Sequence, residues 1–181
     1  LFTIEVICHG VAESRFFEDY ITNLEKKYKA KAISCNFRSK YRLNAKQSME
    51  VVFKNGKRYR SPSTRYDWFY SVYLNNLVLK QGCYNCKFAI PERSADISIA
   101  DYWGEDKRKE KAYSTIIVNS RLGYEVWLHA RDEMTYQSVD EAEVYFPNMH
   151  HPTVKPNNYD KFWEIYNQKG YLFAQKYIGN N

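Results

Sequence analysis

The chain has 181 residues, of which 44% are hydrophobic and 17% aromatic, and it carries a formal net charge of +6 with a pI of about 9.0. This composition excludes a disordered chain, and no apolar run approaches the roughly 20 residues that a membrane-spanning helix needs. The sequence begins at Leu1 inside an apolar run and shows no secretory leader, so we expect a cytoplasmic fragment of a longer protein.

The first half of the chain predicts a strand, a helix, a second strand, a hairpin and a second helix. These elements are residues 2–7, 12–28, 31–37, 48–60 and 64–79. The first strand is mostly apolar and is expected to be buried, whereas the first helix has apolar side chains at helical spacing and charges on its other face. The hairpin is expected to turn at Asn55-Gly56, with both residues at positive φ. Thr64 lies near the start of the second helix.

The second half predicts two strands, a helix, a linker with three prolines and a broken terminal helix. These elements are residues 96–104, 114–119, 120–134, 146–158 and 158–178. Ser120 or Asn119 is positioned to cap the helix at 120–134, and Gly170 is expected to break the last helix. Strands alternate with helices, but a hairpin interrupts them. We therefore predict an α/β or α+β fold with a mixed β-sheet flanked by helices. A domain over 1–145 would be followed by a linker and C-terminal helices over 146–181.

The four cysteines include one C-x-x-C pair, Cys83 and Cys86, in the stretch CYNCKF. Without a secretory leader, such a pair indicates metal or redox chemistry rather than a disulfide framework. Three interpretations stay open from the residue types: metal or cluster ligands, a dithiol redox pair, and inert buried thiols. A dithiol redox pair usually opens a helix after a strand, and this pair instead follows a predicted helix. Cys35 alternates with apolar strand residues and is expected in the core.

Four motifs occur in a defined order. They are ICHGV (7–11), NFRSK (36–40), GCYNCKF (82–88) and SADISIADYWG (94–104). Together they resemble the C-terminal domain of the coenzyme F-420 hydrogenase/dehydrogenase beta-subunit family, from Leu1 to about Met134. The resemblance implies a flavin- and iron–sulfur-containing oxidoreductase subunit that moves electrons between a [4Fe–4S] cluster, FAD and a deazaflavin or other acceptor. In many bacteria such chains also resemble genes of surface-polysaccharide synthesis.

The resemblance assigns roles to nine residues. The implied cluster ligands are Cys8, Cys83 and Cys86, and a fourth ligand would come from a proline–cysteine motif upstream of Leu1. The implied cofactor-binding residues are Arg38, Lys40, Asp96, Asp101, Trp103 and Gly104. Lys80, Lys87 and Arg93 lie near the paired cysteines in sequence and would favour thiolates there. The implied partner is a ferredoxin-like redox domain or subunit.

A second hypothesis comes from the positive charge. Basic residues occur in short groups over 26–31, 38–42, 54–60 and 107–111. They suit a non-catalytic binding module, zinc-stapled or metal-free, for nucleic acid or an acidic partner. These groups are scattered over several predicted elements rather than forming one stripe, so nucleic acid is the less favoured partner. The oxidoreductase hypothesis leads, and we expect the fragment alone to be inactive.

Overall fold

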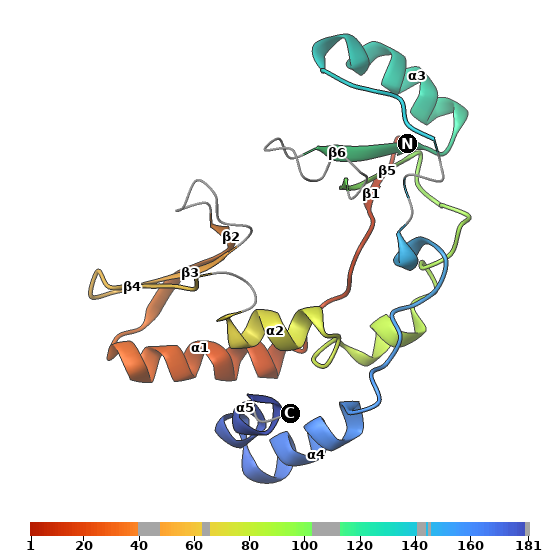
Figure 1. Cartoon of the computed structure of the whole chain (residues 1–181). Helices are drawn as coiled ribbons and strands as arrows, with labels where there is room; N and C mark the ends of the chain where they lie inside the picture. Colours follow the sequence, from red (N-terminus) through yellow and green to blue (C-terminus); the bar gives the residue numbers. More distant parts are fainter. Residues whose placement is uncertain (40–47, 63–65, 103–112, 141–143, 145, 180–181) are drawn as a thin grey trace. The chain divides into compact units, whose positions relative to one another are not determined.

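The computed structural model describes residues 1–39, 48–62, 66–102, 113–140, 144 and 146–179 (Figure 1). The chain divides into two compact units, each assembled from two separate stretches of sequence. Unit 1 comprises residues 1–10 and 82–153, and unit 2 comprises residues 11–81 and 154–181. The predicted mixed α/β class is confirmed, with one sheet in each unit. The predicted boundary at residue 145 stays a prediction.

Unit 1 contains a three-stranded mixed sheet in the order β1-β5-β6. Strand β1 (Ile4–Val6) runs parallel to β5 (Ile97–Asp101), and β6 (Ser114–Val118) runs antiparallel to β5. Helix α3 (Arg121–Ala130) follows β6 and is capped as predicted, because the Ser120 hydroxyl accepts a hydrogen bond from the Gly123 N–H at 3.0 Å. Three short 3₁₀ segments complete the described elements of this unit. They are η2 (Gln81–Asn85), η4 (Arg131–Glu133) and η6 (Pro147–Met149).

The prediction that the first strand is buried is wrong. Ile4 and Val6 are 57% and 65% exposed. They share one face of the sheet with Ile99 and Ile116, which are 36% and 37% exposed, because residues paired in register point to the same side. The apolar run therefore belongs to an edge strand, with its alternate residue Glu5 on the opposite, more polar face.

Unit 2 places helix α1 (Ser14–Tyr28) between an antiparallel sheet and two C-terminal helices (Figure 1). The sheet has the order β2-β3-β4, formed by β2 (Ala32–Ser39), β3 (Ser48–Phe53) and β4 (Arg58–Arg60). The helices are α4 (Tyr159–Lys169) and α5 (Tyr171–Gly179). Phe16, Tyr20 and Leu24 recur every four residues along α1 and are buried, as the helical spacing predicts.

The hairpin of unit 2 forms as predicted, but its turn differs. Of the predicted turn pair, Gly56 alone has a positive φ, of 81°. The Gly56 N–H donates to the Phe53 carbonyl at 2.9 Å, and the Lys57 N–H donates to the Asn55 side chain at 3.1 Å. The loop is thus longer than two residues, with glycine at the single left-handed position that such loops need.

The second helix is shorter than predicted, and the last helix breaks where predicted. Helix α2 spans Trp68–Leu74 and is capped by Asp67, while the predicted start at Thr64 lies outside the described residues. Asn76, at a φ of 61°, turns the chain out of the helix and toward a single bridge between Leu79 and Ala12. At Gly170, a φ of 83° separates α4 from α5.

Candidate functional site

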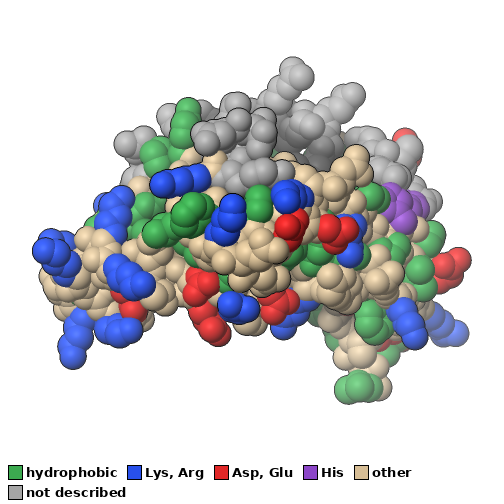
Figure 2. Space-filling view, turned by 90° about the horizontal axis from the view of Figure 1, so that it is seen from below, with side chains coloured by type: hydrophobic (Ala, Val, Ile, Leu, Met, Phe, Trp, Pro, Cys, Tyr) green, Lys and Arg blue, Asp and Glu red, His purple; other side chains and the backbone are tan. Residues whose placement is uncertain are grey.

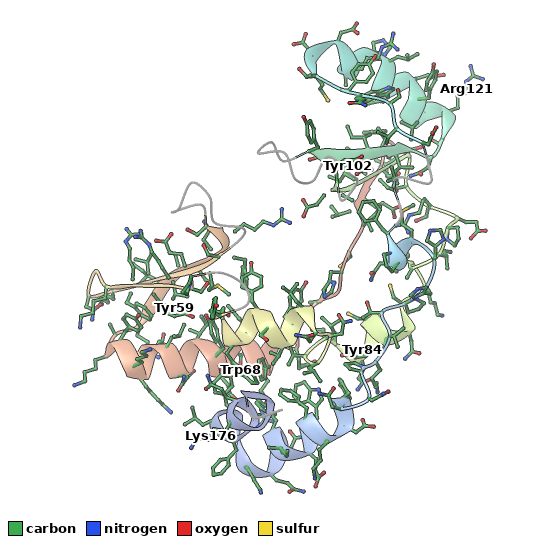
Figure 3. All side chains as sticks on the ribbon, viewed as in Figure 1. Tyr59, Trp68, Tyr84, Tyr102, Arg121 and Lys176 are labelled. Carbon is green, nitrogen blue, oxygen red and sulfur yellow. The ribbon has the colours of Figure 1, made fainter. Side chains whose placement is uncertain are left out.

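The three cysteines of the predicted cluster all belong to unit 1, whereas Cys35 belongs to unit 2. No disulfide bond joins the four cysteines. Cys8 is exposed and follows β1, whose last pairing is the Ile7 N–H to the Ile99 carbonyl at 2.9 Å. Cys83 lies in η2 and precedes Tyr84, which is labelled in Figure 3. Both Cys83 and Cys86 are half-buried. Unit 1 therefore supplies accessible thiols from two stretches of the chain that are more than 70 residues apart in sequence.

These thiols do not form a complete ligand set by themselves. Among the residues that the structure describes, no group of three or more His, Cys, Asp or Glu side chains is arranged to hold a metal ion. A cubane cluster needs four ligands, usually thiolates. The described donors thus do not complete a cluster site by themselves. The assignment of Cys8, Cys83 and Cys86 as ligands stays a prediction.

A partly buried ion pair fixes the segment that follows the C-x-x-C pair, and no sequence pattern indicated it. The Arg93 side chain is only 7% exposed, and its Nε donates to Glu5 Oε1 of β1 at 2.5 Å. Its Nη1 donates to the carbonyls of Phe88 at 2.9 Å and Ile90 at 3.2 Å. Arg93 therefore binds β1 to residues 88–90.

Glu5 accepts from two partners on this polar face of the sheet. Besides Arg93, the Ser98 hydroxyl donates to Glu5 Oε1 at 2.5 Å, and Asn119 Nδ2 donates to Ser98 Oγ at 2.8 Å. Burial alone would raise the pKa of Glu5, but the hydrogen bonds from Arg93 and Ser98 outweigh it, and the pKa is lowered. A pocket of about 210 Å³ opens beside this pair, lined by Glu5, Lys87, Phe88, Ile90, Glu92, Arg93 and Ser94.

Asp96, a predicted cofactor-binding residue, holds unit 1 together. One carboxylate oxygen accepts from the Thr3 N–H and hydroxyl, both at 2.8 Å, and the other accepts from the Ser120 hydroxyl at 2.5 Å. Hydrogen bonds from Ser120 and Thr3 lower the pKa of Asp96. A Cβ at Gly123 would overlap the Asp96 carbonyl oxygen, so α3 needs glycine there to approach the sheet. Both carboxylate oxygens are thus occupied by the fold.

The other predicted cofactor-binding residues are divided between the units. Asp101 is the last residue of β5 and is half-buried, in register with Ser114. Arg38 lies on β2 of unit 2, with an exposed side chain. The remaining three lie outside the described residues: Lys40, Trp103 and Gly104. A flavin role for these six residues remains a prediction.

A buried carboxylate that the sequence did not single out lies in unit 2. Asp67 is fully buried and accepts hydrogen bonds from the hydroxyls of Tyr20 at 2.7 Å and Tyr59 at 2.8 Å (Tyr59 is labelled in Figure 3). It also caps α2 by accepting from the Tyr70 N–H at 2.9 Å. Burial, and then the charge of Asp67, raise the pKa of both tyrosines and bring the pKa of Cys35 to about 11. Because the raised pKa keeps Cys35 protonated at neutral pH, Cys35 is poorly suited to bind a metal as a thiolate.

Comparison with protein families settles the ancestry of the chain. The family model for the C terminus of the beta subunit of coenzyme F420 hydrogenase/dehydrogenase matches residues 1–143. The chain belongs to this family. The resemblance carried by the four sequence motifs is thereby confirmed. No curated protein and no solved structure matches the chain.

Membership of the F420 hydrogenase/dehydrogenase beta-subunit family is consistent with redox electron transfer as part of a larger complex. The family match ends at residue 143, so α4 and α5 lie beyond it although they complete the core of unit 2. None of the described helices combines the length and the apolar character needed to cross a membrane.

Proposed function

We propose that this F420 hydrogenase/dehydrogenase beta-subunit domain contributes Cys8, Cys83 and Cys86 as thiolate ligands of a [4Fe–4S] cluster in a cytoplasmic oxidoreductase subunit. Its reaction is electron transfer between the cluster, FAD and a flavin or deazaflavin acceptor. Family membership supports the redox class. The observation that carries the ligand assignment is that these three exposed or half-buried cysteines, none of them in a disulfide, belong to one unit.

The missing donor is part of the proposal. Three thiolates leave a cubane one ligand short, so the proposal requires one further ligand besides these three cysteines. The chemistry of the donors supports a cluster over a hard cation, because soft thiolates favour iron–sulfur and zinc sites. The proposed setting in polysaccharide biosynthesis is supported by the resemblance alone.

Anaerobic purification and reconstitution of the full chain test the ligand assignment. We expect iron and acid-labile sulfide in equal amounts and a brown colour in the wild type and in Cys35→Ser. The matched double variant Cys83→Ser/Cys86→Ser should lose both. Flavin released on denaturation measures the second cofactor. Folded protein that stays colourless and free of iron, or that holds zinc in place of iron, would contradict the proposal.

A further inference from the structure

Unit 2 carries a concentrated positive surface where α1 ends and the β3–β4 hairpin turns. We name it the lysine end, and it comprises Lys26, Lys27, Lys29, Lys54 and Lys57, all exposed. Lys and Arg side chains gather at the left of Figure 2, the end of the view at which α1 and this turn lie in Figure 1. The sequence had predicted scattered basic groups, but folding brings two of them together.

Specific contacts hold the end of α1 against the β3–β4 turn at the lysine end. Asn55 Nδ2 of the turn donates to the Tyr28 carbonyl at 3.1 Å, and the Lys54 N–H donates to the Lys31 carbonyl at 2.8 Å. The rings of Tyr28 and Phe53 stack with centroids 4.5 Å apart. The backbone that carries these lysines is therefore fixed, while the ammonium groups remain in water.

Few local carboxylates offset this charge. Within the described part of the chain, no ion pair joins any of the five lysines to an acid. The neighbouring Glu25 is engaged by Lys31 Nζ at 2.7 Å and by the Ala32 N–H at 2.9 Å. The carbonyls at the end of α1 favour lysines in its last turn but do not neutralise them. The lysine end thus presents a net positive field to solvent.

The chemistry of the surface favours an acidic protein over the other polyanions. The lysine end has no exposed aromatic side chain on which a base could stack, because Tyr28 is packed against Phe53. It likewise contributes no exposed apolar side chain for insertion into lipid, although Ile33 is exposed on the neighbouring strand. Hydrated lysines act as point charges that steer a protein partner into brief contact, the mode used by electron-transfer encounters.

We propose that the lysine end is the docking surface for the acidic face of an electron-transfer protein or domain. The inference rests on the proposed redox function. It assigns the positive charge of unit 2 to partner recognition and leaves cofactor binding to other residues.

Binding of the full chain to two purified probes, an acidic ferredoxin and an acidic flavodoxin, tests the surface. Lys26→Gln/Lys27→Gln/Lys54→Gln/Lys57→Gln removes four charges from the lysine end. Its matched control removes four charges from exposed lysines elsewhere in unit 2: Lys80→Gln/Lys155→Gln/Lys169→Gln/Lys176→Gln. Circular dichroism melts verify that both variants are folded.

We expect at least one probe to bind the wild type with a Kd that rises about tenfold or more between about 50 mM and about 300 mM salt. At low salt the lysine-end variant should bind about tenfold more weakly, and the control within about twofold. Equal weakening in both variants, salt-independent binding, or binding of neither probe would overturn the proposal. So would a lysine-dependent preference for duplex DNA or phosphatidylserine vesicles over both probes.

The two proposals fail separately, because binding is measured without electron transfer. Iron, sulfide and flavin are determined on the same preparations. A chain that lacks cofactors but binds a probe through the lysine end would refute the proposed function and retain the docking surface. A chain that holds its cofactors but binds the probes equally well without the four lysines would retain the proposed function and refute the docking surface.

Discussion

Replacement of Arg93 by methionine should loosen the segment after the C-x-x-C pair more than any exposed charge substitution. The variant removes the guanidinium from a pair with Glu5 and frees the carbonyls of Phe88 and Ile90. Breaking a fully buried pair costs about 3–5 kcal/mol. Since the Glu5 side chain is 20% exposed and keeps its Ser98 hydrogen bond, we expect a smaller cost of about 2–3 kcal/mol.

Hydrogen exchange by mass spectrometry measures this loss locally. A change of about 2–3 kcal/mol corresponds to roughly 30- to 150-fold faster exchange in peptides that cover residues 86–97. Peptides from α1 in unit 2 should not change. The control is Arg121→Gln, whose pair with Glu125 spans 3.1 Å at side chains 93% and 53% exposed (Arg121 is labelled in Figure 3). It should cost less than about 0.5 kcal/mol. If the amide protons of residues 86–97 exchange at the same rate in Arg93→Met and Arg121→Gln, the Arg93–Glu5 pair does not anchor this segment.

Three further predictions concern stability. Asp67→Ala should lower the free energy of unfolding by about 3 kcal/mol, because it removes a helix cap and the acceptor of two tyrosine hydroxyls, one buried and one half-buried. In the same urea titration, Asp160→Ala at an exposed residue should lower it by under about 1 kcal/mol. Gly123→Ala should lower the free energy of unfolding by at least about 2 kcal/mol, since its methyl group would overlap a carbonyl oxygen, and its melting temperature should fall. In Gly82→Ala the added methyl group would have nothing within 4 Å, and the melting temperature should hardly change. Because the pKa of Glu5 is lowered on folding, its ionised form stabilises the fold. This stabilisation is complete above about pH 4.3, the pKa in the unfolded chain, and is lost as the pH falls through the folded pKa. In Glu5→Gln, an acid titration of stability should lack this pH-dependent loss.

Local patterns predicted the elements whose signals lie within a few residues. The spacing of Phe16, Tyr20 and Leu24 predicted α1, and Gly170 predicted the break between α4 and α5. Ser120 indicated the start of α3, because a cap is read from adjacent residues. The turn at Asn55-Gly56 was right in place and wrong in type, since the dipeptide allows loops of different lengths.

Features that depend on distant residues could not be predicted in this way. Glu5 and Arg93 are 88 residues apart, and neither has a neighbour that marks it as paired. The exposure of Ile4 and Val6 depends on which strand occupies the sheet edge, and an apolar run is the same at an edge or at the centre. The sequence also could not tell whether Cys8 approaches the C-x-x-C pair, because spacing along the chain carries no information on that convergence.

Asp67 has a consequence for how unit 2 comes apart. Its two carboxylate oxygens accept hydrogen bonds from residues of α1, β4 and the first turn of α2. If one of these three elements detached, polar groups in the others would lose a hydrogen-bond partner. Fraying one at a time is thereby penalised, and the three should melt as one cooperative block. Their slowest amide protons would then report a single shared opening event, even though the segments are far apart along the polypeptide.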